Sequence, residues 1–269
     1  MIRAITEHHR PSGALVSTAG IAADRAADGL QPQDLSQFED FLRASQNMIV
    51  GFSPETPWKS WLDRLPLSRS PTSVRARQTI YRAGEPLEGV PVICEGWAAR
   101  VSQLSDGRRQ ILSFMLPGNL ISTNAVFVSS LNFHVEAITS VRYSFFDRDA
   151  FNEQLSTNPS LMRDLVKYCL LEKEETDELA TNLGQRRAEE RIAWLILFLR
   201  RRIEARGMVR DQSFPFPLRQ QHIADATGLT AVHVNRVLGA LRKDGLVEIS
   251  DGMLKIGDLA GLQRLAYLI

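Results

Sequence analysis

Residues 218–256 read LRQQHIADATGLTAVHVNRVLGALRKDGLVEISDGMLKI, and this pattern predicts the fold of the C-terminal third of the chain. The pattern predicts a short helix over 220–227, a sharp turn at Gly228, and a second helix from an N-cap at Thr230 to about Asp244. Gly228 suits the turn because a glycine adopts the left-handed conformation without a clash of a Cβ atom. The second helix carries one apolar stripe, which predicts its buried face: Val234, Val237, Leu238 and Leu241.

Two further apolar runs, 246–249 and 253–256, flank Ser250-Asp251-Gly252 and predict a two-stranded wing after the second helix. The stretch as a whole therefore predicts a winged helix-turn-helix. An α-helix fits the major groove of duplex DNA, and the amino end of the helix presents side chains to the base edges. The candidate DNA-binding residues are Gln220, Gln221, Thr230, Ala231, Val232, His233, Asn235 and Arg236.

The chemistry of these side chains suits the recognition of bases. Asn235 can form a bidentate pair with adenine, and Arg236 can pair with guanine or hold a phosphate. Ala231 and Val232 can contact a thymine methyl group, and the free backbone amides near Thr230 can bind a phosphate. An alternative function is a ligand-binding signalling module whose helix-turn-helix contacts a protein instead of DNA.

Upstream, residues 78–149 alternate short β-branched or aromatic runs with turn signals. Asp106-Gly107 between two such runs is a strong hairpin signal, because both residues tolerate a positive φ. The expected strands cover 79–81, 91–94, 98–104, 109–115, 133–139 and 141–146. Several short strands at this spacing predict a β-sandwich or jelly roll rather than a parallel sheet with crossover helices.

A long helix is expected over 158–183, because Asn158 can cap it and Pro159 suits its first turn. A seven-residue repeat on this helix gives a candidate self-association seam: Met162, Leu165, Cys169, Thr176, Leu179 and Leu183. The alternative is a helix that packs on its own strands. A second helix over 186–206, whose Arg200-Arg201-Arg202 is interpreted as a solvated end, and an extended connector over 214–217 complete the chain up to the helix-turn-helix.

The composition is that of an ordinary globular chain. Its 269 residues are 44% hydrophobic and 23% charged, which excludes a wholly disordered chain and a coiled-coil rod. The longest apolar run, 192–199, is far shorter than the roughly 20 residues that span a bilayer. Cys94 and Cys169 are too few for a disulfide framework. With no secretory signal visible, we expect a cytoplasmic protein. Residues 184–269 hold 14 Lys and Arg against 9 Asp and Glu, which suggests a polyanionic partner.

The order of a glycine-punctuated β-sandwich, a long helix and a winged helix-turn-helix resembles the Crp/Fnr family of bacterial transcription regulators. The resemblance covers about 58–256 and rests on these stretches: Ala83-Gly84-Glu85, Glu95-Gly96-Trp97, Leu116-Pro117-Gly118, Phe145-Phe146-Asp147-Arg148 and 228–236. It implies an α+β chain with a cyclic-nucleotide-binding-like sensor domain (58–157), a dimerisation helix (158–184) and a winged helix-turn-helix domain (185–269). The Ala-, Gly- and Ser-rich residues that precede them, with one apolar stripe in 31–46, predict a flexible extension that holds a short helix (1–57). It also implies a homodimer on a two-fold site in double-stranded DNA, an effector at the sensor domain, and RNA polymerase as a further partner, with no membrane partner.

The resemblance implies a candidate effector pocket, and there the sequence departs from the family. Members that bind cyclic AMP carry a Gly-Glu pair and an Arg-Ser pair, and the corresponding positions here are Ser122-Thr123 and Phe133-His134. Without the arginine a phosphate lacks its main charge-assisted partner, which argues against cyclic AMP.

Other chemistries are open or disfavoured by the residues. The oxygen-sensing branch of the family carries an N-terminal cysteine cluster, whereas the first cysteine here is Cys94, which argues against an iron–sulfur cluster. A haem or another small effector stays open. The sequence shows no metal-ligating set and no catalytic constellation, so we expect a regulator rather than an enzyme.

Overall fold

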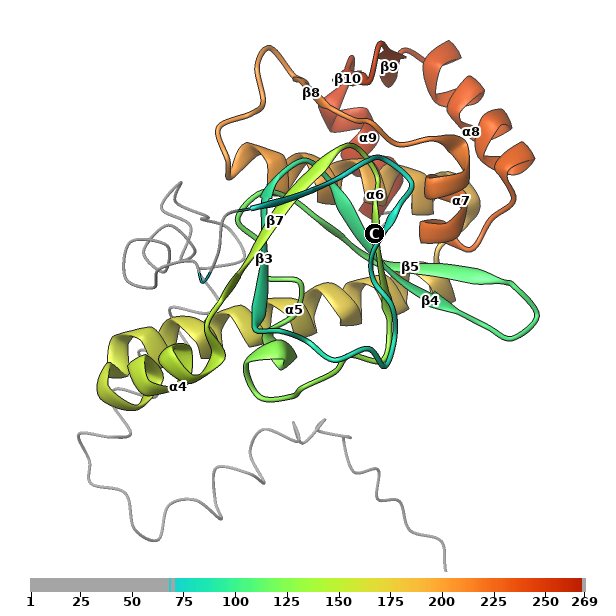
Figure 1. Ribbon diagram of the computed structural model, residues 1–269. Helices are drawn as coiled ribbons and strands as arrows, with labels where there is room; N and C mark the ends of the chain where they lie inside the picture. The colour runs from blue at the N-terminus through green and yellow to red at the C-terminus, as the bar shows by residue number, and fades with distance from the viewer. Residues whose placement is uncertain (1–67, 69–70, 268–269) are drawn as a thin grey trace, which may run out of the picture. The chain divides into compact units, whose positions relative to one another are not determined.

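The computed structural model describes Ser68 and residues 71–267, and Figure 1 shows the course of the chain from the blue-green strands to the red C-terminal helix. The extension expected at 1–57, with its short helix, lies outside the described residues. So does most of 58–70, the expected start of the sensor domain.

The first half of the described chain consists of β1 (Thr72–Val74), β2 (Thr79–Tyr81), β3 (Val90–Glu95), β4 (Ala98–Gln103), β5 (Arg109–Met115), the 3-10 helix η1 (Thr123–Val126), β6 (His134–Ala137), β7 (Val141–Phe146) and α4 (Arg148–Thr157). The second half consists of α5 (Pro159–Gln185), α6 (Ala188–Glu204), β8 (Ser213–Pro215), α7 (Gln220–Thr227), α8 (Ala231–Lys243), β9 (Val247–Ser250), β10 (Met253–Ile256) and α9 (Leu259–Tyr267). No helix in this described part is long and apolar enough to cross a membrane.

The strands of the first half form two antiparallel sheets with the orders β2-β6-β4-β5 and β1-β7-β3. Strands β4 and β5 form the hairpin around Asp106-Gly107, with Ala98 opposite Met115. Both sheets contribute side chains to one core, in which Val92 of β3 and Val135 of β6 are buried. The predicted β-sandwich, followed by a long helix and a helix-turn-helix, is therefore confirmed as an α+β architecture.

Helix α4 was not expected from the sequence. The Asp147 side chain caps it by accepting a hydrogen bond from the Ala150 N–H (2.8 Å). Its inward face has only Phe151 and Leu155 as buried apolar side chains. Two apolar positions are too few to reveal the helix from the hydrophobic periodicity of the sequence. The helix closes the sandwich because both of these residues join the sandwich core.

Helix α5 begins as predicted, since the Asn158 side chain accepts hydrogen bonds from the backbone N–H groups of Ser160 and Leu161 (both 3.2 Å). The prediction that Leu165 belongs to an intermolecular seam is wrong. Leu165 is 1% exposed and packs into the sandwich core of its own chain. The reason is that residues three and four apart share a helix face, and the sandwich takes that face.

The remaining seam positions differ in their surroundings. Leu179 is half-buried against the core of the C-terminal domain, and a Cδ atom of Leu183 lies near Gly228. Met162 is 38% exposed and Thr176 is also exposed, while Cys169 is intermediate. Val166, which the seven-residue repeat omitted, is 42% exposed. The outward face of α5 therefore has an apolar start that includes Val166 and excludes Leu165.

The two predicted strands of the wing are present and paired, and a third strand, which the sequence did not predict, joins them. Strand β10 pairs with β9 on one edge and with β8 on the other, so Leu254 lies opposite both Ile249 and Phe214. The sequence predicted an extended segment at 214–217, but its pairing partner lies about 40 residues away in sequence. Pro215 is tolerated because β8 is an edge strand, where a missing N–H is harmless.

The helix-turn-helix contacts the sandwich through α7. Arg109 of β5 forms a bidentate pair with Glu136 of β6 (3.0 and 2.7 Å), and its Nε lies 3.4 Å from an oxygen of Asp225 in α7. Gln110 Nε2 donates a hydrogen bond to the Ala226 carbonyl oxygen (3.2 Å). Strand β5 is therefore joined to the first helix of the helix-turn-helix by charged and polar contacts.

Arg202 makes a second connection between the two halves. Its guanidinium donates hydrogen bonds to the Phe114 carbonyl oxygen (2.7 Å) and to Asn119 Oδ1 (3.0 Å), and it pairs with Glu175 of α5 (3.5 Å). The interpretation of 200–202 as a solvated helix end is wrong for Arg202, because the last turn of α6 packs against the end of β5 and buries this side chain.

Two glycines provide a matched test of the sandwich. Gly96 has φ +83°, and a Cβ atom there would lie 2.1 Å from the Ser140 carbonyl oxygen, whereas Gly107 has φ +87° and open space around it. We expect Gly107→Ala to cost about 1 kcal/mol, the penalty of a left-handed alanine. We expect Gly96→Ala to cost about 3 kcal/mol or more, because the backbone must also move. Urea unfolding of the two variants measures the difference, and equal midpoints would contradict the close packing at Gly96.

Candidate nucleic-acid interface

The turn between α7 and α8 is a left-handed cap at Gly228, which has φ +66° and ψ +31°. The Leu229 N–H donates a hydrogen bond to the Ala224 carbonyl oxygen (3.1 Å), which closes the end of α7. A Cβ atom at Gly228 would lie 3.4 Å from Leu183 and 3.5 Å from the Arg191 guanidinium. The turn therefore fixes how α8 leaves α7, as the sequence predicted.

Thr227 is a buried polar residue at the end of α7, and both of its polar groups have partners. Its hydroxyl donates to the Ile223 carbonyl oxygen (2.7 Å). Its carbonyl oxygen accepts a hydrogen bond from Arg191 of α6 (3.1 Å). A buried threonine is therefore accommodated without an unsatisfied group, and it fastens α7 to α6.

Helix α8 is anchored by one apolar stripe. Val234, Val237, Leu238 and Leu241 are all buried, as predicted, and each contributes about 1.5–3 kcal/mol of hydrophobic free energy. The Thr230 hydroxyl accepts a hydrogen bond from the His233 N–H (3.2 Å), so the predicted N-cap is present.

The opposite face of α8 near its amino end is open to solvent. Val232 is 82% exposed, and Asn235 and Arg236 are also exposed, while Ala231 and His233 are intermediate. Gln220 Nε2 donates a hydrogen bond to Asn235 Oδ1 (2.9 Å), so two of the candidate residues from different helices meet. This contact, which the sequence did not indicate, orients the Asn235 amide on the exposed surface.

The side chains of the two residues that follow Gln220 form hydrogen bonds within the protein. Gln221 donates a hydrogen bond to Asp225 (2.6 Å), and it is thereby turned along α7. His222 Nδ1 accepts a hydrogen bond from the Arg219 N–H (3.2 Å) at the start of α7. Burial lowers the pKa of His222, and the positive charge of Arg219 lowers it further. His222 therefore acts as a neutral cap.

The candidate effector residues lie in the sandwich near α5. Ser122, Thr123 and Phe133 are buried. Thr123 donates hydrogen bonds to Glu172 of α5, and the Arg100 guanidinium lies 5.4 Å from the centre of the Phe133 ring.

His134, the remaining candidate effector residue, accepts a hydrogen bond from the Ala83 N–H (3.4 Å) instead. Sequence reasoning missed Arg100 and Glu172, because they are 72 residues apart and no local motif joins them.

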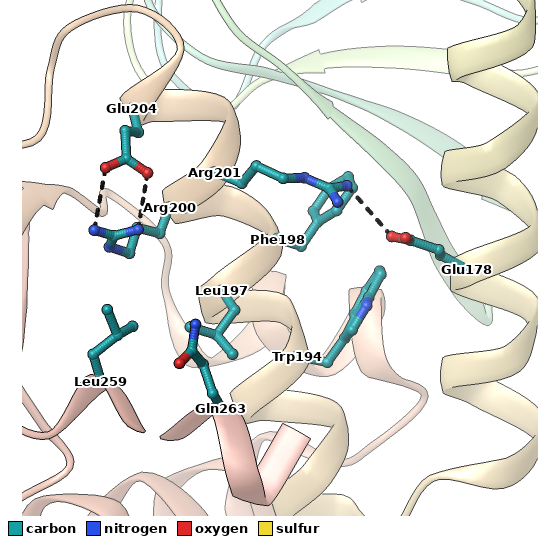
Figure 2. Close-up of a pocket in the computed structure, with 9 residues that line it drawn as sticks. All are labelled: Glu178, Trp194, Leu197, Phe198, Arg200, Arg201, Glu204, Leu259 and Gln263. Carbon is teal, nitrogen blue, oxygen red and sulfur yellow. Dashed lines mark hydrogen bonds and ion pairs between the residues drawn. The ribbon is translucent and has the colours of Figure 1, made fainter. Parts of the chain in front are cut away.

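A separate hollow of about 190 Å³ lies between α6 and α9, and Figure 2 shows its lining. Its floor includes the stacked rings of Trp194 and Phe198, whose centres are 5.0 Å apart. Arg201 points at Glu178 (3.5 Å) across one side, and Arg200 binds Glu204 through two hydrogen bonds on the other (Figure 2). None of the candidate residues lines this hollow.

Comparison with known proteins gives the same two-part division. A model of the Crp-like helix-turn-helix domain matches residues 190–265, and a model of the cyclic nucleotide-binding domain matches residues 71–158.

Curated relatives and solved structures match across both parts. The nitrogen fixation regulation protein FixK of Bradyrhizobium diazoefficiens is 32% identical over 174 residues, which are 65% of this chain and 72% of that protein. The transcriptional activator protein FnrL of Cereibacter sphaeroides is 28% identical over 180 residues, which are 66% of this chain and 72% of that protein. The solved structure of FixK2 from Bradyrhizobium japonicum has a TM-score of 0.65 at 26% identity, and it covers 73% of this chain and 96% of that one.

The lowered pKa of His222 predicts a pH dependence of stability. Below about pH 6.5 the unfolded chain takes up a proton at His222, whereas the folded chain takes it up only at a lower pH. The contribution of His222 to the free energy of unfolding is therefore fully present above this pH and is lost as the pH falls through the lower pKa of the folded state. His222→Gln keeps a side-chain acceptor for the Arg219 N–H and removes the titration. We expect its melting temperature to fall less between pH 7 and pH 5.5 than that of the wild type. Equal falls would show that His222 titrates normally in the folded protein.

Proposed function

The chain belongs to the Crp/Fnr family of transcription regulators, and we propose that it acts as a homodimer that reads a two-fold DNA site through α8. It is a DNA-binding transcriptional regulator. The observation that carries the proposed reading surface is the exposed amino end of α8, where Val232 is 82% exposed beside Asn235 and Arg236.

The chemistry of this surface supports base recognition. Arg236 has an exposed guanidinium that suits the two acceptors of guanine, and Asn235 suits adenine. The hydrogen bond from Gln220 leaves the Asn235 amide group free to donate, so the residue is held in place without losing its donor. Thr230, Ala231 and His233 line the same helix end, where backbone N–H groups favour a phosphate. We assign Gln221 a supporting part, because it is bound to Asp225.

The dimer is proposed to form through the outward face of α5. Met162 and Val166 are apolar and exposed there, and Thr176 continues the exposed face along the helix, whereas Cys169 is half-buried against the sandwich core. Exposed apolar side chains on a long helix favour association with a second helix. A two-fold dimer places two copies of α8 so that they enter successive major grooves.

The rest of the assignment follows from the family. We propose that the sandwich up to residue 157 is the sensor domain, that 158–184 is the dimerisation helix, and that 185–269 binds DNA. We further propose an effector at the sensor domain, RNA polymerase as a partner, a place in the cytoplasm, and no catalytic activity of its own.

A footprint on genomic fragments tests the proposed reading surface. We expect protection of a two-fold site with half-sites about one helical turn, or ~10 base pairs, apart. Arg236→Ala should lower affinity for that site by about 10- to 100-fold, because one bidentate contact to a base is lost in each half-site. Arg264→Ala is the matched control, since it removes the same charge from α9.

Two results would contradict this function. One is the absence of protection on every fragment at low salt with cell extract present. The other is unchanged affinity and specificity in Arg236→Ala, which would place the reading helix elsewhere. If the helix-turn-helix contacts a protein instead, binding to random duplex DNA will lack the steep salt dependence that phosphate contacts produce.

A further inference from the structure

Glu172 of α5 reaches into the sandwich and is held there by three donors. Its carboxylate accepts hydrogen bonds from the Thr123 hydroxyl and from the Thr123 N–H (3.3 Å). It also pairs with Arg100 of β4, whose Nη1 lies 3.1 Å from the second carboxylate oxygen. Both side chains of the ion pair are largely buried. A backbone amide, a hydroxyl and a guanidinium converging on one carboxylate are the partners that a bound oxyanion needs.

Arg100 is fixed independently of Glu172. Its guanidinium lies over the Phe133 ring, 5.4 Å from the ring centre, and this contact orients the cation. Its Nε is buried and has no hydrogen-bond partner among the described residues. The guanidinium therefore keeps a donor that a carboxylate side chain from α5 does not use, and an oxyanion with more acceptor oxygens has a partner for it.

We propose that Arg100 and Thr123 form a binding site for a small oxyanion in the sensor domain, and that Glu172 occupies this site as an internal ligand. The site contains Thr123 and Phe133 of the expected effector pocket, and it takes its guanidinium from β4 instead of from the position of Phe133. An external carboxylate or phosphate binds at the site only by displacing Glu172. This displacement breaks the contacts of Glu172 that join the sandwich to α5. This regulatory consequence rests on the proposed function, whereas the site itself does not.

Competition between Glu172 and a free oxyanion determines how anions affect the stability of the wild type and of a variant without this carboxylate. In the wild type the internal carboxylate is tethered at high effective concentration, so free anions compete poorly. Removal of the carboxylate leaves a largely buried guanidinium without its counter-charge, which destabilises the fold. A small anion that enters the vacated space restores the pair and stabilises the folded state by mass action.

The experiment is a chemical rescue of Glu172→Ala in the full chain. Thermal unfolding is measured in formate, acetate, phosphate and chloride at equal ionic strength. We expect a lowered melting temperature in chloride and a saturable rise of about 3–6 °C in at least one oxyanion. The anions that raise the melting temperature more, the carboxylates formate and acetate or the phosphate, identify the chemical class of the natural oxyanion. The double variant Arg100→Met/Glu172→Ala should show no rise, and neither should Glu174→Ala, which removes an exposed carboxylate two residues along the helix.

No specific rise in Glu172→Ala would overturn the proposal, as would an equal rise in the double variant or in the wild type. If Glu172→Ala fails to fold in chloride, the readout becomes the refolding yield, which must increase in an oxyanion and not in chloride. Duplex binding by the wild type is measured separately. If the wild type does not bind duplex DNA but the oxyanion still rescues Glu172→Ala, the proposed DNA function is rejected and the oxyanion site is retained.

Discussion

The left-handed turn at Gly228 is the constraint on which the proposed DNA-binding surface depends. It directs α8 so that Val234 and Leu238 enter the core while Val232 and Arg236 face solvent. A residue with a Cβ atom would strain the turn because φ is positive there, and its Cβ would lie in van der Waals contact with Leu183 of α5 and Arg191 of α6. Gly228 thus lies where the end of α5, the helix α6 and the start of α8 come together.

The sequence predicts most accurately the structure whose causes are local. The bounds of α7 and β10, the cap at Thr230 and the strand at 109–115 follow from periodicity, capping chemistry and turn residues within a few positions. The third strand of the wing could not be predicted, because Phe214 finds its partner Leu254 only after the chain has folded. The burial of Leu165 is a similar case, since helix periodicity shows an apolar face and not which surface covers it.

Arginines join the sandwich to the helices that follow it in the chain. Arg109 joins β5 to α7 through Asp225, and Arg202 joins α6 to the end of β5 and to α5. Arg100 joins β4 to α5 through Glu172. Arg109 and Arg202 thus make residues of the sandwich part of the contacts that position α6 and α7. These residues have no signature in the sequence, since a buried arginine and a solvated one look alike there.

If the amino end of α8 enters the major groove as proposed, a photo-crosslinker at position 232 must lie against the base edges. Val232 is exposed and outside the core, so replacing it with benzoylphenylalanine leaves the fold intact. Irradiation with a duplex that carries the protected site should give an adduct to a base within a half-site, and a random duplex should give much less. Adducts to protein alone, or an equal yield on both duplexes, would contradict the entry of α8 into the major groove.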